Sequence, residues 1–253
     1  MSWYHRRFML VPILFVVSQF VAVGAEAIVN GELDTTNQAV GVWLHDASKC
    51  SGVIIAKDGT TGWVLTAAHC VFGTLGQFRQ GNDHSFPDYV YPVVQAIVHP
   101  DYATDPTLDF ALLRLAGAGS PTPVLAPLAP FEDRVATGTE MTLSGYGNTE
   151  VGATSLRHSG VVDVTTVSPN QIRSESAVNA SFGDGGGAAI VTIYGTPRLA
   201  GTISHSDSAT YTVCARVSAV YAGFLVNMIG LPSPPFFADG FESGDTGAWS
   251  GST

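Results

Sequence analysis

The chain has 253 residues, enough for one large all-β domain or two smaller ones with a well-filled core. Its formal net charge of −10 argues against nucleic acid and anionic membrane surfaces as partners, because both would repel it. A charged fraction of only 13%, together with 28 glycines and 14 prolines, is typical of many short strands joined by turns.

The amino-terminal segment has the pattern of an export signal. Arg6 and Arg7 precede an almost wholly apolar run over 8–23, and Ala25-Glu26-Ala27 supplies small residues at a cleavage position. We therefore predict a signal peptide over 1–27 and a secreted or periplasmic protein. The alternative, a membrane anchor, is opposed by the shortness of the apolar run. No later stretch predicts a membrane span. Cleavage after Ala27 is favoured over cleavage after Ala25, which would leave two extra residues.

Short runs rich in β-branched and aromatic residues follow, separated by Gly, Pro, Asp and Asn. The strands predicted from them cover residues 40–44, 53–56, 63–66, 93–98, 110–115, 141–144, 160–167, 188–194 and 199–204. The sequence Tyr194-Gly195-Thr196-Pro197 predicts a hairpin turn. This pattern indicates an all-β sandwich or barrel.

The organisation of the chain predicts two β halves over about 28–116 and 134–220, joined by an Ala/Pro-rich linker over 116–130. A helix is expected over 219–229, with Val220, Phe224 and Met228 on one face and Gly230 ending it. The main domain would therefore span 28–230. The remaining segment, 231–253, is rich in Pro, Gly and Ser, and we expect it to form an acidic tail outside the core.

Three cysteines, Cys50, Cys70 and Cys214, allow at most one intramolecular bridge and leave one thiol over. There is no CxxC pair and no His/Cys cluster with zinc spacing, so we expect no metal and no cofactor.

Three features bear side chains or backbone suited to catalysis. His69 follows an apolar strand amid small residues, and Asp109 is a lone acid at the head of another apolar strand, where a histidine N–H would be a good partner. The glycine-rich stretch 183–187 has a backbone that can approach a ligand closely. Taken singly, each has a plain structural interpretation as a buried histidine, a strand cap or a turn.

Taken together, these features resemble the chymotrypsin/trypsin family of serine proteases, whose catalytic residues occur in the order His, Asp and a Gly-Asp-x-Gly-Gly loop. The similarity covers nearly the whole chain after residue 27. It includes residues 28–31, 50–55, 63–70, 109–115, 144–147, 201–204 and 215–218. The resemblance implies two packed six-stranded antiparallel β-barrels, a short carboxy-terminal helix and serine-type endopeptidase chemistry.

The resemblance also implies local roles. His69 and Asp109 would be the catalytic pair, Gly183 and Gly185 the oxyanion hole, and Cys50–Cys70 a disulfide that leaves Cys214 as a buried free thiol. A new amino terminus at Ile28 would pair with Asp184. The substrate pocket would include Asn179, Ser204 and Ser206, and the neutral Asn179 implies no strong preference for Arg or Lys.

One departure changes the functional expectation. Gly185 stands where the family has its nucleophilic serine, and Ala188 where a proline is usual. Glycine cannot attack a carbonyl, so the leading hypothesis is a catalytically inactive pseudoprotease, a monomer that binds a protein or peptide in the cleft between its barrels. The alternative is an active endopeptidase with an unrecognised nucleophile, for which Ser181, Ser204, Ser206 or a bound water are candidates. A decayed relative without function is a third hypothesis.

The tail carries a separate resemblance. Residues 237–250 are similar to a short carboxy-terminal signature on exported proteins of some Gram-negative bacteria. That resemblance implies a sorting or processing signal, and the alternative is a disordered acidic tail.

Overall fold

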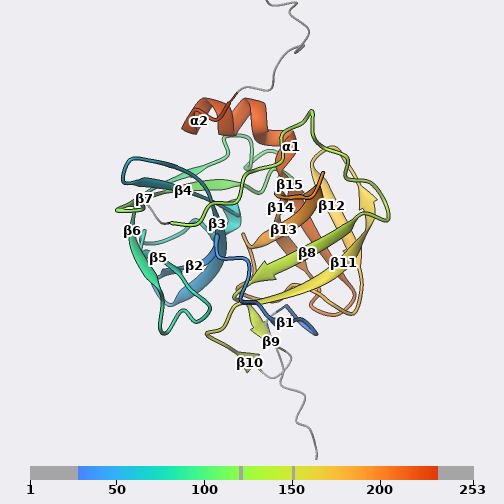
Figure 1. Cartoon of the computed structure of the whole chain (residues 1–253), viewed down its shortest axis with the longest axis horizontal. Coiled ribbons are helices and arrows are strands. Elements are labelled where there is room, and N and C mark those ends of the chain that lie inside the picture. The colour runs from blue at the N-terminus through green and yellow to red at the C-terminus, as the bar shows by residue number, and fades with distance from the viewer. Residues whose placement is uncertain (1–27, 120–121, 150–151, 233–253) are drawn as a thin grey trace, which may run out of the picture.

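Antiparallel strands close into two barrels that lie side by side in this computed structural model, which describes residues 28–119, 122–149 and 152–232 (Figure 1). The first barrel is closed in the order β2-β3-β4-β7-β6-β5. The second follows β8-β11-β12-β15-β14-β13, and β13 pairs again with β8, while β1 adds to the outside of β11. The predicted pair of six-stranded barrels is confirmed.

The strands are short and match most of the predicted runs. The first barrel contains β2 (Val40–His45), β3 (Ser48–Asp58), β4 (Thr61–Thr66), β5 (Gln77–Gln80), β6 (Tyr89–Val98) and β7 (Ala111–Ala116). The second contains β8 (Glu140–Gly145), β11 (His158–Val167), β12 (Gln171–Glu175), β13 (Ala188–Ile193), β14 (Thr196–Ser206) and β15 (Tyr211–Arg216). Smaller strands are β1 (Glu32–Leu33), β9 (Asn148–Thr149) and β10 (Gly152–Ala153).

Strand β7 is an almost continuous apolar run because both of its faces are covered. Leu113 and Leu115 point into the first barrel, whereas Leu112 joins the apolar cluster between the two barrels. Both faces of the strand are therefore covered, and alternation with polar residues is lost. The same interbarrel cluster receives Leu199 from β14 and Phe224 from the carboxy-terminal helix.

The hairpin between β13 and β14 turns where it was expected. Tyr194 and Gly195 have φ angles of 49° and 76°, and Ile193 pairs with Thr196 across them. Two central residues with positive φ define a tight turn whose twist matches the flanking strands.

The carboxy-terminal helical segment begins two residues earlier than predicted. It consists of α1 (Val217–Val220), a π-helical stretch η2 (Tyr221–Val226) and α2 (Asn227–Ile229). Gly230, with φ of 66°, ends it in the left-handed conformation that glycine adopts at little cost. The helix packs Phe224 against the interbarrel cluster and the His99 ring, and so ties the chain end to both barrels.

A buried ion pair joins the amino-terminal segment to the second barrel. The Asp34 carboxylate lies 3.4 Å from Nε of Arg157, and both side chains are fully buried. Burial opposes ionisation of Asp34, but hydrogen bonds from Ser144, Asn37 and Thr36 outweigh it and lower its pKa to about 2. The guanidinium also donates to carbonyl oxygens of the first barrel, among them Val40 O. This network therefore bridges the two barrels.

The predicted signal peptide and most of the predicted tail lie outside the described residues. Across residues 28–119, 122–149 and 152–232, no helix has the length and hydropathy needed to cross a membrane.

Candidate active site

The histidine–aspartate pair forms where two neighbouring strands of the first barrel bring their ends together. His69 lies in the short helix η1 (Ala68–Cys70) after β4, and Asp109 lies just before β7, which pairs with β4. His69 Nδ1 lies 2.7 Å from Asp109 Oδ2, and the His69 backbone N–H donates to Oδ1 at 2.9 Å. A carboxylate can only accept, so Nδ1 carries the proton and Nε2 is left for the opposite side of the ring.

Asp109 is held by a third donor from the second barrel. The Ser204 hydroxyl, on β14, donates to Oδ2 at 2.6 Å. Burial raises the pKa of Asp109, but the hydrogen bonds and charge of His69, together with the Ser204 bond, outweigh it and lower the pKa below its usual value. The aspartate is thus a fixed anion that orients the imidazole. Ser204 lines the cavity, where it was expected as a pocket residue, and its bond to Asp109 was not anticipated.

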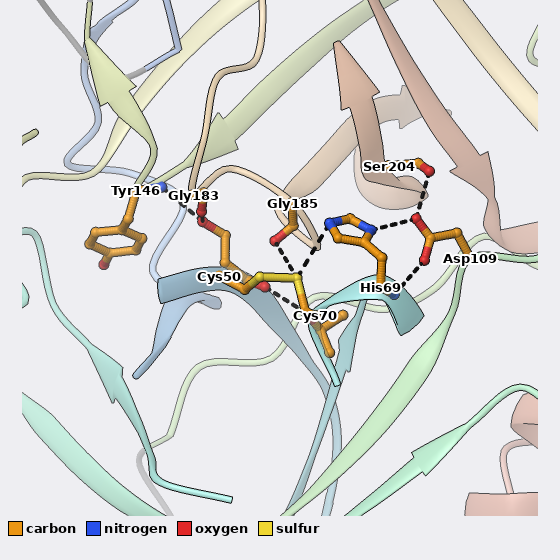
Figure 2. Close-up of a disulfide and its surroundings, with 10 residues drawn as sticks. Cys50, His69, Cys70, Asp109, Tyr146, Gly183, Gly185 and Ser204 are labelled. Carbon is orange, nitrogen blue, oxygen red and sulfur yellow. Dashed lines mark hydrogen bonds and ion pairs between the residues drawn. A yellow bond between two sulfur atoms is a disulfide. The ribbon is translucent and has the colours of Figure 1, made fainter. Parts of the chain in front are cut away.

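The glycine loop brings residue 185 against the imidazole ring (Figure 2). The loop is held through its main chain: Ser51 N donates to Gly185 O at 2.8 Å, and Gly186 N donates to Ile203 O at 2.7 Å. A Cβ built on Gly185 would lie 2.7 Å from His69 Nε2 and 3.1 Å from Cε1. The ring therefore occupies space that any side chain at position 185 would need.

The two glycines expected to form an oxyanion hole both line the cavity. Within the described residues, the N–H groups of Gly183 and Gly185 donate to no acceptor. Gly183 has a φ of 99°, a backbone conformation that favours glycine, and a Cβ on it would also require the Lys49 side chain, 2.8 Å away at Cε, to shift.

Asp184 lies beneath the loop and contacts the start of the described chain. Its carboxylate accepts N–H bonds from Gly147 at 2.7 Å, from Ser181 at 2.9 Å and from Ile28. Complete burial nevertheless raises the pKa of Asp184 to about 6. Ile28 is fully buried with φ of 52°, a left-handed conformation that a β-branched residue rarely adopts.

A cavity of about 340 Å³ extends from His69 and the glycine loop to the β14 edge. Fifteen residues line it, none of them acidic: Ser48, Lys49, Cys50, His69, Phe72, Ala180, Ser181, Phe182, Gly183, Gly185, Ile203, Ser204, His205, Ser206 and Ser208. Ser206 was expected there. Asn179 is fully buried and does not line the cavity. Its side-chain N–H donates to Ser176 O, and its Oδ1 accepts from the Thr212 hydroxyl.

The cysteines follow the sequence expectation. Cys50 and Cys70 form a disulfide next to His69, and Cys214 is a buried free thiol whose pKa burial raises to about 12. Cys50, Cys70 and His69 place potential metal-ligand atoms within 4.8 Å of one another. The two sulfurs are bonded to each other, however, so neither can act as a thiolate ligand.

Several cavity residues were missed by sequence reasoning, among them Lys49, Phe72 and Phe182. Lys49 crosses to the second barrel, where its ammonium donates to Gly147 O at 3.3 Å and Thr154 O at 3.0 Å, and desolvation lowers its pKa. Phe72 and Phe182 are 52% and 72% exposed on the cavity wall. Their available signal was position: Lys49 precedes Cys50, and Phe182 precedes the glycine loop.

Comparison with known proteins places the whole arrangement in a family. The family model described as Trypsin matches residues 28–223, and the chain therefore belongs to the trypsin-like serine protease family. Human granzyme M is 32% identical over 140 residues, which cover 53% of this chain and 53% of the relative. Mouse vitamin K-dependent protein C is 29% identical over 225 residues, covering 73% of this chain and 47% of the relative. The chain spans about half the length of these curated relatives.

Proposed function

We propose that this member of the trypsin-like family is a secreted pseudoprotease that binds a peptide or protein in the cleft between its barrels without cleaving it. The observation that carries the proposal is the contact between Gly185 and His69. Position 185 has no hydroxyl, and a Cβ added there would lie 2.7 Å from His69 Nε2, so a serine would require the imidazole to shift. In subtilisin, a serine protease of unrelated fold that uses the same Ser-His-Asp chemistry, loss of the nucleophile costs on the order of 10⁶ in kcat.

The nearby serines do not replace the missing hydroxyl. The Ser204 hydroxyl is used by Asp109, and that of Ser206 donates to Tyr211 O at 2.6 Å. Among the described residues, no serine hydroxyl lies within hydrogen-bond distance of His69 Nε2, whose nearest recorded partner is Cys70 Sγ at 3.6 Å. The binding surface, in contrast, keeps the fixed Asp109–His69 pair, the two unoccupied N–H groups and an open cavity.

Export and maturation form part of the same proposal. The Cys50–Cys70 disulfide fits an oxidising compartment. Signal cleavage after Ala27 would free the Ile28 amino group beside Asp184, whose buried carboxylate is only partly compensated by the charge of Lys49 among the described residues. Cleavage would also remove the constraint on the φ angle of Ile28, which costs about 1–3 kcal/mol while the preceding peptide bond is intact. The proposal extends to the tail over 231–253, whose residues 237–250 would act as a sorting signal.

The test uses a fluorophosphonate probe, which labels activated serines, followed by a mixed peptide library. The natural protein should neither label nor cleave, and should bind peptides in a titration monitored by fluorescence. Gly185→Ser restores the hydroxyl but also introduces the Cβ that His69 obstructs, so we expect labelling that is slow. Ser181→Ala, which alters the remaining serine of the loop region, is the control. Labelling of the natural protein that disappears in Ser181→Ala would support the alternative endopeptidase instead.

A further inference from the structure

The Cys50–Cys70 disulfide lies directly against the histidine of the site. Cys70 Sγ is 3.6 Å from Nε2 of His69 and 3.7 Å from Gly185 O, as Figure 2 shows. A disulfide sulfur carries no hydrogen, so neither contact is a hydrogen bond while the bridge is intact. A thiol at the same position would have a hydrogen to donate, and both distances suit the longer bonds that sulfur makes.

Glycine at position 185 leaves the imidazole available to this sulfur. Asp109 accepts from Nδ1 of His69, so Nε2 has a free lone pair and can take up a proton. A Cβ on Gly185 would lie 2.7 Å from Nε2 and 3.5 Å from Cys70 Sγ. The space that a side chain at 185 would fill therefore adjoins both the base and the sulfur. In the described part of the chain, Cys70 Sγ is the nearest recorded partner of Nε2.

The two sulfurs of the bridge differ in access. Cys50 lines the cavity of about 340 Å³ and is 8% exposed, whereas Cys70 is fully buried and does not line it. Thiol–disulfide exchange begins when a thiolate attacks one sulfur and the other leaves, so access decides which sulfur is attacked. A small thiol that enters the cavity would meet Cys50, and Cys70 would be the leaving sulfur beside His69.

We infer that the Cys50–Cys70 disulfide is redox-active: a low-molecular-weight thiol opens it through Cys50, and the released Cys70 thiol becomes a nucleophile with His69 as its base. The attacking thiolate forms an S–S bond to Cys50, the Cys50–Cys70 bond breaks, and Cys70 leaves with the electron pair. A second thiolate attacks the mixed disulfide and releases Cys50. Two external thiols are thereby oxidised to one disulfide, and their protons end on Cys70 and Cys50.

The opened site would align a cysteine, a histidine and an aspartate. The Cys70 thiol would donate to Nε2 of His69, whose Nδ1–H already donates to Asp109, and the Ser204 hydroxyl holds that carboxylate in place. Transfer of the thiol proton to Nε2 leaves a thiolate beside an imidazolium, and Asp109 balances the new positive charge. Cysteines activated by an adjacent histidine in this way are strong nucleophiles near neutral pH.

Other titratable groups near the site are Lys49 and His205, which line the cavity, and Asp184, which lies beneath the glycine loop. All three are kept in the variants below. A change in reactivity caused by His69→Gln can therefore be assigned to the imidazole.

The opening step is tested on the natural protein, without any variant. The folded protein is incubated with reduced glutathione and EDTA, quenched with acid, digested with pepsin and mapped by mass spectrometry. We expect at least about tenfold more glutathione on Cys50 than on Cys70 at early times, with the far-UV circular dichroism unchanged. Cys214, the buried free thiol, is the internal control and should stay unmodified. A bridge that opens only in denaturant, or glutathione mainly on Cys70, would overturn the inference.

The nucleophile is tested with two matched cysteine variants. Cys50→Ser leaves the Cys70 thiol free without a reductant, and Cys70→Ser leaves the Cys50 thiol free in the same cavity. Both react with iodoacetamide at pH 6 and pH 9. A thiol paired with imidazole is more ionised at pH 6 but less nucleophilic as a thiolate, which leaves Cys70 about tenfold faster than Cys50 at that pH.

The histidine is then removed from the reactive variant. Adding His69→Gln to Cys50→Ser should abolish the tenfold advantage at pH 6 and change the rate at pH 9 by less than about threefold, because ordinary thiols are also ionised there. A purely structural effect of the substitution would change both rates alike. Natural protein reduced with dithiothreitol and desalted gives the same comparison between its own two thiols if a cysteine variant does not fold.

Two results would overturn the assignment of nucleophile and base. Both sulfurs lie within 4.8 Å of a His69 ring nitrogen, so faster labelling of Cys50 than of Cys70 would place the reactive thiol on the wrong cysteine. A Cys70 rate at pH 6 that is the same with and without His69 would remove the histidine from the mechanism. Peptide binding by the protein with its bridge intact is measured separately and does not depend on either result.

Discussion

A single methyl group added at Gly185 should destabilise the protein through one contact, with His69. The φ angle of Gly185 is outside the left-handed region, so its backbone accepts a side chain. The added Cβ, however, would lie 2.7 Å from Nε2, about 0.7 Å short of the 3.4 Å at which ordinary van der Waals contact begins. The ring must move outward, and its side chain, 39% exposed, has room to do so at the expense of its bond to Asp109.

The expected magnitude follows from two opposing effects. Crowding a packed site costs about 1–3 kcal/mol. Replacing glycine by alanine restricts the unfolded chain and returns about 0.4–1 kcal/mol. Gly185→Ala should therefore lower the free energy of unfolding by about 1–2 kcal/mol, and Tm by roughly 2–8 °C for a chain of this size.

A double-mutant cycle isolates the contact. Urea denaturation of the natural protein, Gly185→Ala, His69→Ala and the double variant should show that at least about 1 kcal/mol of the cost of Gly185→Ala disappears once the imidazole is gone. Gly223→Ala is the matched control, because a Cβ there meets nothing within 4 Å. A coupling energy below about 0.3–0.5 kcal/mol, the range expected of independent sites, would refute the claim that His69 obstructs a side chain at position 185.

Three further predictions concern stability. The pKa of Asp34 is lowered from 3.8 to about 2 in the folded protein. This difference stabilises the fold at pH values above 3.8, and the stabilisation is lost as the pH falls toward 2. The stability gap between the natural protein and Asp34→Asn in urea should thus shrink by about 1 kcal/mol from pH 7 to pH 3, and a constant gap would contradict it. For Asp184, whose folded pKa of about 6 is raised, ionisation costs stability as the pH rises through 6. A chain that starts at Ile28 should offset this cost. Its free energy of unfolding in urea should exceed that of a chain starting two residues earlier by up to about 3 kcal/mol at pH 7, but not at pH 4. Reducing the Cys50–Cys70 bridge, with a sequence separation of 20, should cost about 3 kcal/mol in calorimetry with and without reductant, and a Cys70→Ala variant should be insensitive to the reductant.

Residues with a local pattern could be placed from the sequence alone. The apolar strands around His69 and Asp109 were predicted close to their observed bounds, and the order of the motifs led to the family and the disulfide. Strands β5 (Gln77–Gln80) and β12 (Gln171–Glu175) were missed because they are short and mostly polar, and pairing with neighbours around a closed barrel fixes them instead.

Contacts between distant segments were beyond local reasoning. Arg157 looks like a surface residue in the sequence, because arginine is almost never fully buried unless it is paired. Its partner Asp34 lies on a different segment, and only the packing of the barrels reveals the pair. The approach of the His69 ring to Gly185 is similarly a matter of tenths of an ångström between two barrels. The motif predicted the loss of the hydroxyl but not how close the imidazole lies to position 185.

The glycine loop has a consequence for how such a protein can arise. Its shape depends on main-chain bonds, from Ser51 N to Gly185 O and from Gly186 N to Ile203 O, none of which involves the side chain at 185. A mutation that removes a serine there would therefore leave the loop, the disulfide and the cleft in place. The shape of this loop is thus independent of the side chain at 185, and a single codon change there can alter the chemistry of the cleft without altering its backbone.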